Sequence, residues 1–186
     1  MGEMLKVLVF IQLLGVIVLD LVVLTLFPAL LVGAAVGDLL TFRIPNWVSI
    51  AVVALFLPAA VLAGFDWTQA GLHAALGLCL LAGGMGLFAM GLLGGGDAKL
   101  LAATGLWMGW EALPAYLVWA ALIGGVLAAM VLLFRKMPLA GIEGRAAWIG
   151  RLLDRQQGIP YGIALAGGAL MALPHTIWFD RLATSF

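Results

Sequence analysis

Long apolar runs, separated only by short polar stretches, extend along nearly the whole chain. Hydrophobic residues make up 65% of the sequence and charged residues only 10%, whereas an ordinary globular domain has about 45–50% apolar and about 25% charged residues. A soluble fold of this length could not bury so much apolar surface. Runs of roughly 20 apolar residues are long enough to cross a ~30 Å hydrocarbon core. The sequence therefore predicts an all-α, polytopic membrane protein.

We expect about six transmembrane helices in one membrane domain that covers residues 1–186. Their predicted positions are about 16–37, 46–63, 70–93, 98–110, 113–134 and 159–178. The fourth is short for a full crossing, so it thins the bilayer or is partly re-entrant. The run from Leu5 to Gly37 is too long for one straight crossing and too short for two. Pro28 is a candidate kink, and residues 4–15 either extend the first helix or lie along the membrane surface.

The basic residues indicate an orientation. Seven of the nine Lys and Arg residues fall in connections on one side of the predicted spans, and the positive-inside rule makes that side the cytoplasm. Trp67, Trp110 and Trp178 are predicted near the other interface, as in an aromatic belt.

The one long polar connection is the predicted cytoplasmic loop 135–158. Part of it is amphipathic, with an apolar face of Trp148, Ile149, Leu152 and Leu153 opposite Arg151 and Asp154. This pattern predicts a short helix on the inner leaflet. It serves either as a surface anchor or as a lid or docking surface for a membrane-bound substrate.

Several classes of partner are disfavoured. The formal net charge is zero, so we expect no nucleic acid. Cys79 is the single cysteine, which excludes an internal disulfide and a CxxC zinc pair. His73 and His175 are predicted near the outer ends of their spans, across the membrane from the acids considered next, so we expect no metal site shared with those acids and no cofactor.

Two acids, Asp38 and Asp97, are predicted at the cytoplasmic edge of a span. An ionisable group at such a position is expensive and is a functional candidate by default. Each follows a pair of glycines at small-xxx-small spacing, Gly33 with Gly37 and Gly91 with Gly95. That spacing lets helices approach closely in lipid, which would bring the two carboxylates together.

Two carboxylates a few ångströms apart share a proton and titrate as a pair. The ionised acid can take a proton from water while the protonated acid polarises a carbonyl group, which is the chemistry of an aspartic protease. Simpler interpretations remain open at this point. Asp97 can be the N-cap of the fourth span, Asp38 can be an interface residue, and Lys99 can be a lysine that extends to the membrane surface.

Three segments resemble one known family. "GGGDAKLLAATG" resembles the GxGD motif of membrane aspartyl proteases, in the form found in type IV prepilin peptidases. "DLLTFRIPN" resembles the other acidic segment of that family, and "IPYGIALAGGAL" resembles the segment that opens the last helix of its short members. The segments occur in the family's order, so with the apolar spans the resemblance covers nearly the whole chain.

This resemblance implies an endopeptidase of the bacterial inner membrane that removes the basic leader of prepilin or pseudopilin precursors at the cytoplasmic face. The catalytic pair would be Asp38 and Asp97. Residues expected to bind substrate or support the site are Gly94, Gly95, Gly96, Lys99, Arg43, Pro45, Asn46, Pro160, Tyr161 and Gly162. Pro45 with Asn46, and Pro160 with its two successors, can equally be plain helix starts. The expected partners are the precursor, membrane lipid and other pilus-assembly proteins.

Larger members of this family also N-methylate the new terminus and carry a cysteine-rich insert with paired CxxC motifs. This chain has no such insert, so it resembles the short, peptidase-only kind of tight-adherence (Tad/Flp) systems, and no methyltransferase activity is expected. Leu40 and Phe42 stand where relatives often have basic residues. This difference alters either substrate docking or only the depth of the segment in the membrane.

Two alternatives remain. The same chemistry could act on an archaellin precursor or a signal-peptide remnant. A small transporter or pilus-assembly scaffold could instead use the two acids for structure or as a proton relay. That second class predicts acids near the middle of the bilayer rather than at its edge.

Overall fold

The computed structural model describes residues 2–136 and 147–183, and their regular secondary structure is entirely helical. The elements are α1 (Gly2–Leu21), η1 (Val22–Leu26), α2 (Phe27–Thr41), α3 (Asn46–Leu62), α4 (Trp67–Ala89), α5 (Gly95–Phe134), α6 (Ala147–Leu153), α7 (Gly162–Ala172), η2 (Leu173–His175) and α8 (Ile177–Ala183). Here η1 is a π-helical turn and η2 a 3₁₀ turn.

Within the described residues, 4 helical stretches are long and apolar enough to cross a membrane: Gly2–Thr41, Trp67–Ala89, Gly95–Phe134 and Gly162–Arg181. The helix α3 is apolar but shorter, at 17 residues. The predicted all-α polytopic membrane fold is therefore confirmed. The number of six crossings stays a prediction.

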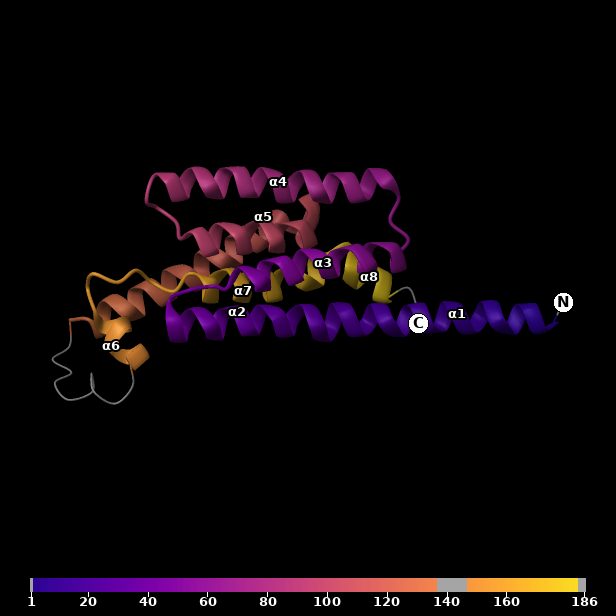
Figure 1. Cartoon of the computed structure of the whole chain (residues 1–186), viewed down its shortest axis with the longest axis horizontal. Helices are drawn as coiled ribbons and strands as arrows, with labels where there is room; N and C mark the ends of the chain where they lie inside the picture. The colour runs from indigo at the N-terminus through magenta and orange to yellow at the C-terminus, as the bar shows by residue number, and fades with distance from the viewer. Residues whose placement is uncertain (1, 137–146, 184–186) are drawn as a thin grey trace.

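The helix α5 is two antiparallel segments joined by a sharp reversal. Gly109 has a backbone conformation (φ 66°, ψ 177°) that interrupts the helix and that only glycine adopts readily. The hydroxyl groups of Thr104 and Tyr116 lie 2.6 Å apart, although twelve residues of straight helix would separate them by roughly 18 Å. Figure 1 shows both ends of α5 at the same end of the molecule. The sequence predicted two spans that meet close to this point.

The first helical stretch is continuous over 40 residues, or roughly 60 Å. Residues 4–15 extend this helix, and Figure 1 shows α1 projecting beyond the other helices. Pro28 does not end the helix. Its ring would clash with the carbonyl group four residues earlier, and the π-helical turn η1 lies just before it, where the Phe27 N–H donates to Val22 O.

A buried aromatic cluster joins α2, α3, α5 and α8. Phe27 stacks on Trp107, and Trp178 contacts both Phe56 and Trp107. The Trp107 indole donates to Val52 O at 2.9 Å, and the Trp178 indole donates to Trp107 O at 2.6 Å. The expectation that Trp178 belongs to an interfacial belt is wrong, because its side chain is fully buried. Trp67 and Trp110 are exposed.

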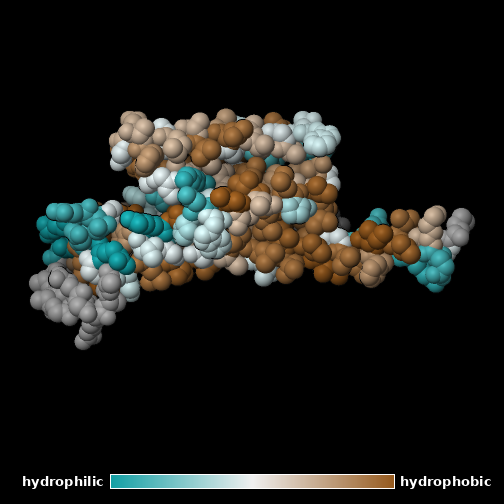
Figure 2. Space-filling model, viewed as in Figure 1, coloured by the Kyte–Doolittle hydropathy of each residue, from teal (hydrophilic) through white to brown (hydrophobic). Residues whose placement is uncertain are grey.

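Polar groups gather at one end of the bundle. The connection 42–45, the connection 90–94 and α6 lie at the same end in Figure 1, and Figure 2 shows hydrophilic residues concentrated there beside a largely apolar flank. These are the connections that the sequence assigns to the cytoplasm. The side of the membrane that they face stays a prediction.

The helix α6 confirms a short helix inside loop 135–158, whose residues 137–146 lie outside the described residues. Arg151, which the sequence assigned to the face opposite the apolar residues, is half-buried, and its guanidinium donates to Leu40 O. The Arg135 guanidinium donates to Leu152 O, Gln157 O and Gly158 O. These bonds fix α6 against the ends of α2 and α5.

Candidate active site

Asp38 lies in the last turn of α2 and is only 5% exposed. The helix ends four residues later, where Phe42 adopts a left-handed conformation (φ 55°) and its N–H donates to Asp38 O at 2.7 Å. This is a helix-ending geometry that non-glycine residues adopt less easily. The Thr41 hydroxyl supports the turn by donating to Gly37 O. The backbone of Asp38 is therefore held by the same contacts that end the helix.

Asp97 lies in the first turn of α5, directly after three glycines. The N-cap residue is Gly94, so the alternative that Asp97 is itself the N-cap is wrong. The Asp97 carboxylate turns back toward the Gly94 backbone. A Cβ atom on Gly94 would lie only 2.6 Å from Asp97 Oδ2. The glycine is needed there because any side chain would displace the carboxylate.

Ile44 and Gly162 link the two acidic segments. A Cβ atom on Gly96 would lie 3.2 Å from Ile44 Cβ, and one on Gly162 would lie 2.8 Å from both Ile44 Cδ1 and Asp38 Oδ2. The Gly162 N–H donates to Asp38 Oδ2 at 2.7 Å. Ile44 therefore lies between the glycine that precedes Asp97 and the glycine that binds Asp38. The two acids therefore share one partly buried region between α2, α5 and α7.

The segment around Gly162 forms the third side of this region. Pro160 is buried, and its carbonyl group accepts from the N–H of Ile163 in the first turn of α7. Tyr161 is 39% exposed, and its ring would be 3.6 Å from a Cβ atom on Gly124. These residues start a helix, as one sequence interpretation held, and they also place the backbone N–H that binds Asp38.

Lys99 and Asn46 lie apart from the acids. The Lys99 ammonium group donates to Asn46 Oδ1 at 2.9 Å, and both residues line a cavity between α3, α4 and α5. Residues two apart on a helix point in different directions, so Lys99 does not share the face of Asp97. Pro45 is the extended residue before α3, and Arg43 is exposed.

The glycine pairs that precede Asp38 and Asp97 do not make the expected helix contacts within the described part of the chain. A Cβ atom on Gly33 or on Gly37 would meet nothing within 4 Å, and the same holds for Gly91. The expectation that these glycines bring helices together is therefore wrong. Other glycines lie at close helix contacts instead. At Gly84 of α4, for example, a Cβ atom would lie 3.1 Å from Ala98 Cβ of α5.

Ile44 is a residue that sequence reasoning missed. It is 8% exposed and lies between Gly96 and Gly162. The only available signal was its place between Arg43 and Pro45 in a segment otherwise interpreted through its polar residues. Likewise, nothing in the sequence predicted that the Arg151 side chain would donate to the end of α2.

Comparisons with known proteins agree on one family. A model of the type IV leader peptidase family matches residues 25–129, which include Asp38, Asp97 and the connections beside them. No solved structure matches the chain.

Curated relatives carry the name prepilin leader peptidase/N-methyltransferase. The protein of that name from Bacillus subtilis is 30% identical over 154 residues, which cover 80% of this chain and 56% of the relative. The protein from Aeromonas salmonicida is 38% identical over 66 residues, which cover 32% of this chain and 23% of the relative. The protein from Burkholderia pseudomallei is 37% identical over 81 residues, which cover 44% of this chain and 21% of the relative. The chain therefore spans at most about half the length of these relatives, and it belongs to the type IV leader peptidase family.

Proposed function

We propose that the chain is a membrane aspartic endopeptidase that removes the basic leader from prepilin or pseudopilin precursors. The main support is that Asp38 and Asp97 lie on either side of Ile44 in one partly buried region, at the end of the bundle that holds the polar connections. Membership of the type IV leader peptidase family and the names of the relatives support the substrate class.

The proposed reaction needs only the two carboxylates and water. The ionised carboxylate takes a proton from water, and the resulting hydroxide adds to the carbonyl carbon of the scissile bond. The protonated carboxylic acid donates a hydrogen bond to the carbonyl oxygen. Collapse of the tetrahedral intermediate breaks the C–N bond, and the leaving nitrogen receives a proton from the pair. The products are a free leader carboxylate and a new N-terminal amine.

The Gly162 N–H orients one carboxylate of the pair. It donates to Asp38 Oδ2, and such a bond stabilises an ionised carboxylate. The Asp97 carboxylate is turned toward the Gly94 backbone, so both acids have a backbone neighbour before substrate arrives. Which of the two is the base is left to experiment.

The glycines before Asp97 are the proposed place for the scissile segment. A peptide bond inside a helix is shielded by its own backbone hydrogen bonds, so the precursor must unwind where it is cut. Gly94 is exposed, and Gly95 and Gly96 are half-buried. Their lack of side chains leaves room for an extended backbone beside the carboxylate.

Co-expression with a prepilin tests this proposal. Asp38→Asn and Asp97→Asn should each reduce leader removal by roughly 10²–10⁴-fold, the usual contribution of an acid–base group. Glu111→Gln is a matched control, because Glu111 is an exposed acid just after the reversal at Gly109, at the far end of α5 from Asp97. Full processing by either Asp variant at normal abundance would reject the pair. Proton-linked solute uptake without any effect on prepilin size would favour a transporter.

The same experiment tests the products. We propose cleavage at the cytoplasmic face of the inner membrane without methyl transfer, although the names of the relatives include N-methyltransferase. The mass of the mature pilin decides this point, because methylation adds about 14 Da to the new N-terminus.

A further inference from the structure

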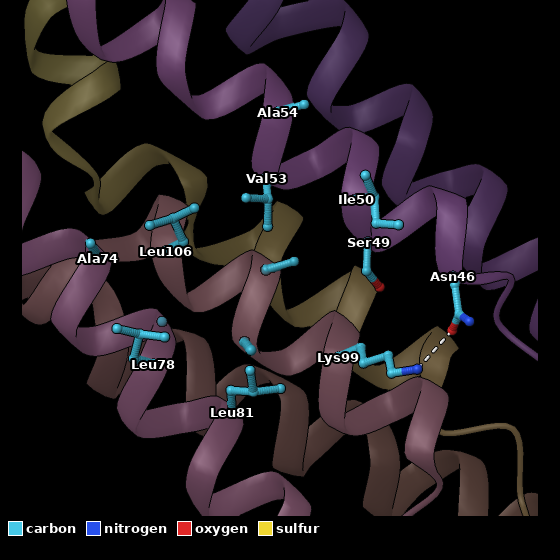
Figure 3. A pocket seen from close by; sticks show the side chains of 13 residues that line it. Asn46, Ser49, Ile50, Val53, Ala54, Ala74, Leu78, Leu81, Lys99 and Leu106 are labelled. Atoms are coloured by element: carbon cyan, nitrogen blue, oxygen red, sulfur yellow. Dashed lines mark hydrogen bonds between the residues drawn. The ribbon is translucent and has the colours of Figure 1, made fainter.

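A large cavity lies on the other face of α5 from Asp97. Its volume is about 690 Å³, and it opens between α3, α4 and the first segment of α5 (Figure 3). Its walls are almost wholly apolar, and its polar groups, Asn46, Ser49 and Lys99, come from the first turns of α3 and α5. We name this cavity the lateral groove.

The polar end of the lateral groove has unused hydrogen-bonding capacity. Ser49 is 7% exposed, and its hydroxyl has no hydrogen-bond partner among the described residues. Figure 3 shows it pointing from α3 toward α5. A buried hydroxyl without a partner costs free energy. This hydroxyl therefore indicates a missing ligand with a polar atom.

Lys99 supplies a positive charge at the same end. Its ammonium group donates to Asn46 Oδ1 and has two further donors. No carboxylate of the described residues forms a salt bridge with it. A ligand that satisfies Ser49 and Lys99 together would carry an oxygen acceptor and negative charge, as a phosphate does.

The size of the lateral groove indicates which apolar group the ligand carries. Along α3 it runs from Asn46 to Ala54, or roughly 12 Å, which is close to the ~15 Å half-thickness of a bilayer core. A methylene group is about as large as a water molecule, roughly 30 Å³, so one acyl chain of sixteen to eighteen carbons takes about 500 Å³. A 20-residue helix of 10–12 Å diameter takes at least about 2,400 Å³, which is far more than the groove holds.

We propose that the lateral groove binds one anionic phospholipid of the leaflet on the active-site side. One acyl chain lies along Ile50, Val53 and Leu78, and the phosphate binds Lys99 and Ser49. The site is two residues from Asp97 in the sequence, but it faces away from the acids. Its occupancy does not depend on the proposed peptidase activity.

Native mass spectrometry of the full chain, released from nanodiscs, tests the proposal. The probes are palmitoyl-oleoyl phosphatidylglycerol and the corresponding zwitterionic phosphatidylcholine. The wild type should retain one phosphatidylglycerol at least tenfold more strongly than phosphatidylcholine. Lys99→Gln should remove this preference, whereas Lys136→Gln, which changes an exposed lysine outside the groove, should keep it.

A second pair of variants tests the apolar part of the lateral groove. Val53→Trp fills its middle, while Val61→Trp makes the same change on the same helix at a position that is 78% exposed and outside the groove. Only Val53→Trp should lower retention of phosphatidylglycerol, by about tenfold. Equal retention by all four variants would overturn the proposal, and so would equal retention of the two lipids by the wild type.

A helical substrate is the competing occupant, and the outcomes separate it from a lipid. If Val53→Trp abolished prepilin cleavage while phosphatidylglycerol retention stayed at the wild-type level, the lateral groove would hold substrate and the lipid proposal would be wrong. If Lys99→Gln and Val53→Trp lose phosphatidylglycerol retention, and the wild type cuts prepilin while Asp38→Asn does not, both the lipid proposal and the peptidase proposal are supported. Wild-type protein that binds the lipid but cuts no prepilin would reject only the peptidase.

Discussion

At the scale of single residues, Gly162 has little freedom to change. Its N–H binds Asp38 Oδ2, and an added Cβ atom would lie 2.8 Å from that same oxygen. Gly162→Ala must therefore move the carboxylate or α7. Because a shift of about 1 Å can cost roughly 10²-fold in rate, we expect at least a tenfold loss of prepilin cleavage without loss of protein. Cleavage assays on equal amounts of purified protein measure this.

Gly158→Ala is the matched control for Gly162→Ala. Gly158 lies four residues earlier, and a Cβ atom on it would meet nothing within 4 Å. The Gly158→Ala protein should cleave prepilin at the wild-type rate. A fully active Gly162→Ala protein would show that the bond to Asp38 has no role in the reaction.

At the scale of elements, the reversal within α5 depends on Gly109. A Cβ atom there would lie 2.7 Å from His73 Cε1, and the residue has a positive φ of 66°. The His73 ring is fixed in turn by a 2.7 Å hydrogen bond with Leu106 O. Gly109→Ala should destabilise the fold by about 1–3 kcal/mol through backbone strain, with more from the clash. Thermal unfolding in detergent checks this.

Gly125 of the same helix gives the contrast. It has no neighbour within 4 Å of an added Cβ atom, and alanine is the better helix former by up to about 1 kcal/mol. Gly125→Ala should therefore keep or raise the unfolding temperature. An unchanged unfolding temperature for Gly109→Ala would contradict the reversal described here.

The docking of α6 is a second prediction at this scale. Arg135 donates to three carbonyl groups between Leu152 and Gly158, and bonds from a charged donor are worth about 1.5–3 kcal/mol each. Arg135→Gln should raise hydrogen exchange of the α6 amides at least tenfold, while Lys136→Gln should not. Unchanged protection of α6 in the Arg135 variant would show that other contacts hold it.

At the scale of the whole molecule, the sequence predicted the helices better than their contacts. Apolar runs and the glycines before Asp97 were sufficient to place the helices that bear both acids. The lack of a neighbouring helix at Gly33 and the burial of Trp178 could not be predicted, because small residues and aromatic rings occur both at helix interfaces and on lipid-facing surfaces. Ile44 was missed because its sequence position does not reveal its neighbours. Only the folded chain places it between Gly96 and Gly162.

Orientation is the prediction that belongs to this scale. Cys79 is the one cysteine, so a Cys79→Ala background accepts single new cysteines. Gln156→Cys lies at the end that bears α6, and Thr68→Cys lies at the start of α4, at the other end. A maleimide that does not cross membranes should label only Thr68→Cys from the outside of spheroplasts. The reverse pattern would place the acids on the outer side.

The central claim is that Asp38 and Asp97 act as one unit in peptide hydrolysis. The most direct measurement is the prepilin cleavage rate of purified wild type, Asp38→Asn, Asp97→Asn and the double variant. Because residues that act together are strongly non-additive, each single change should lower the rate by roughly 10²–10⁴-fold, and the double change should lower it no further. A single variant that cuts at the wild-type rate, or two losses that multiply in the double variant, would contradict the account.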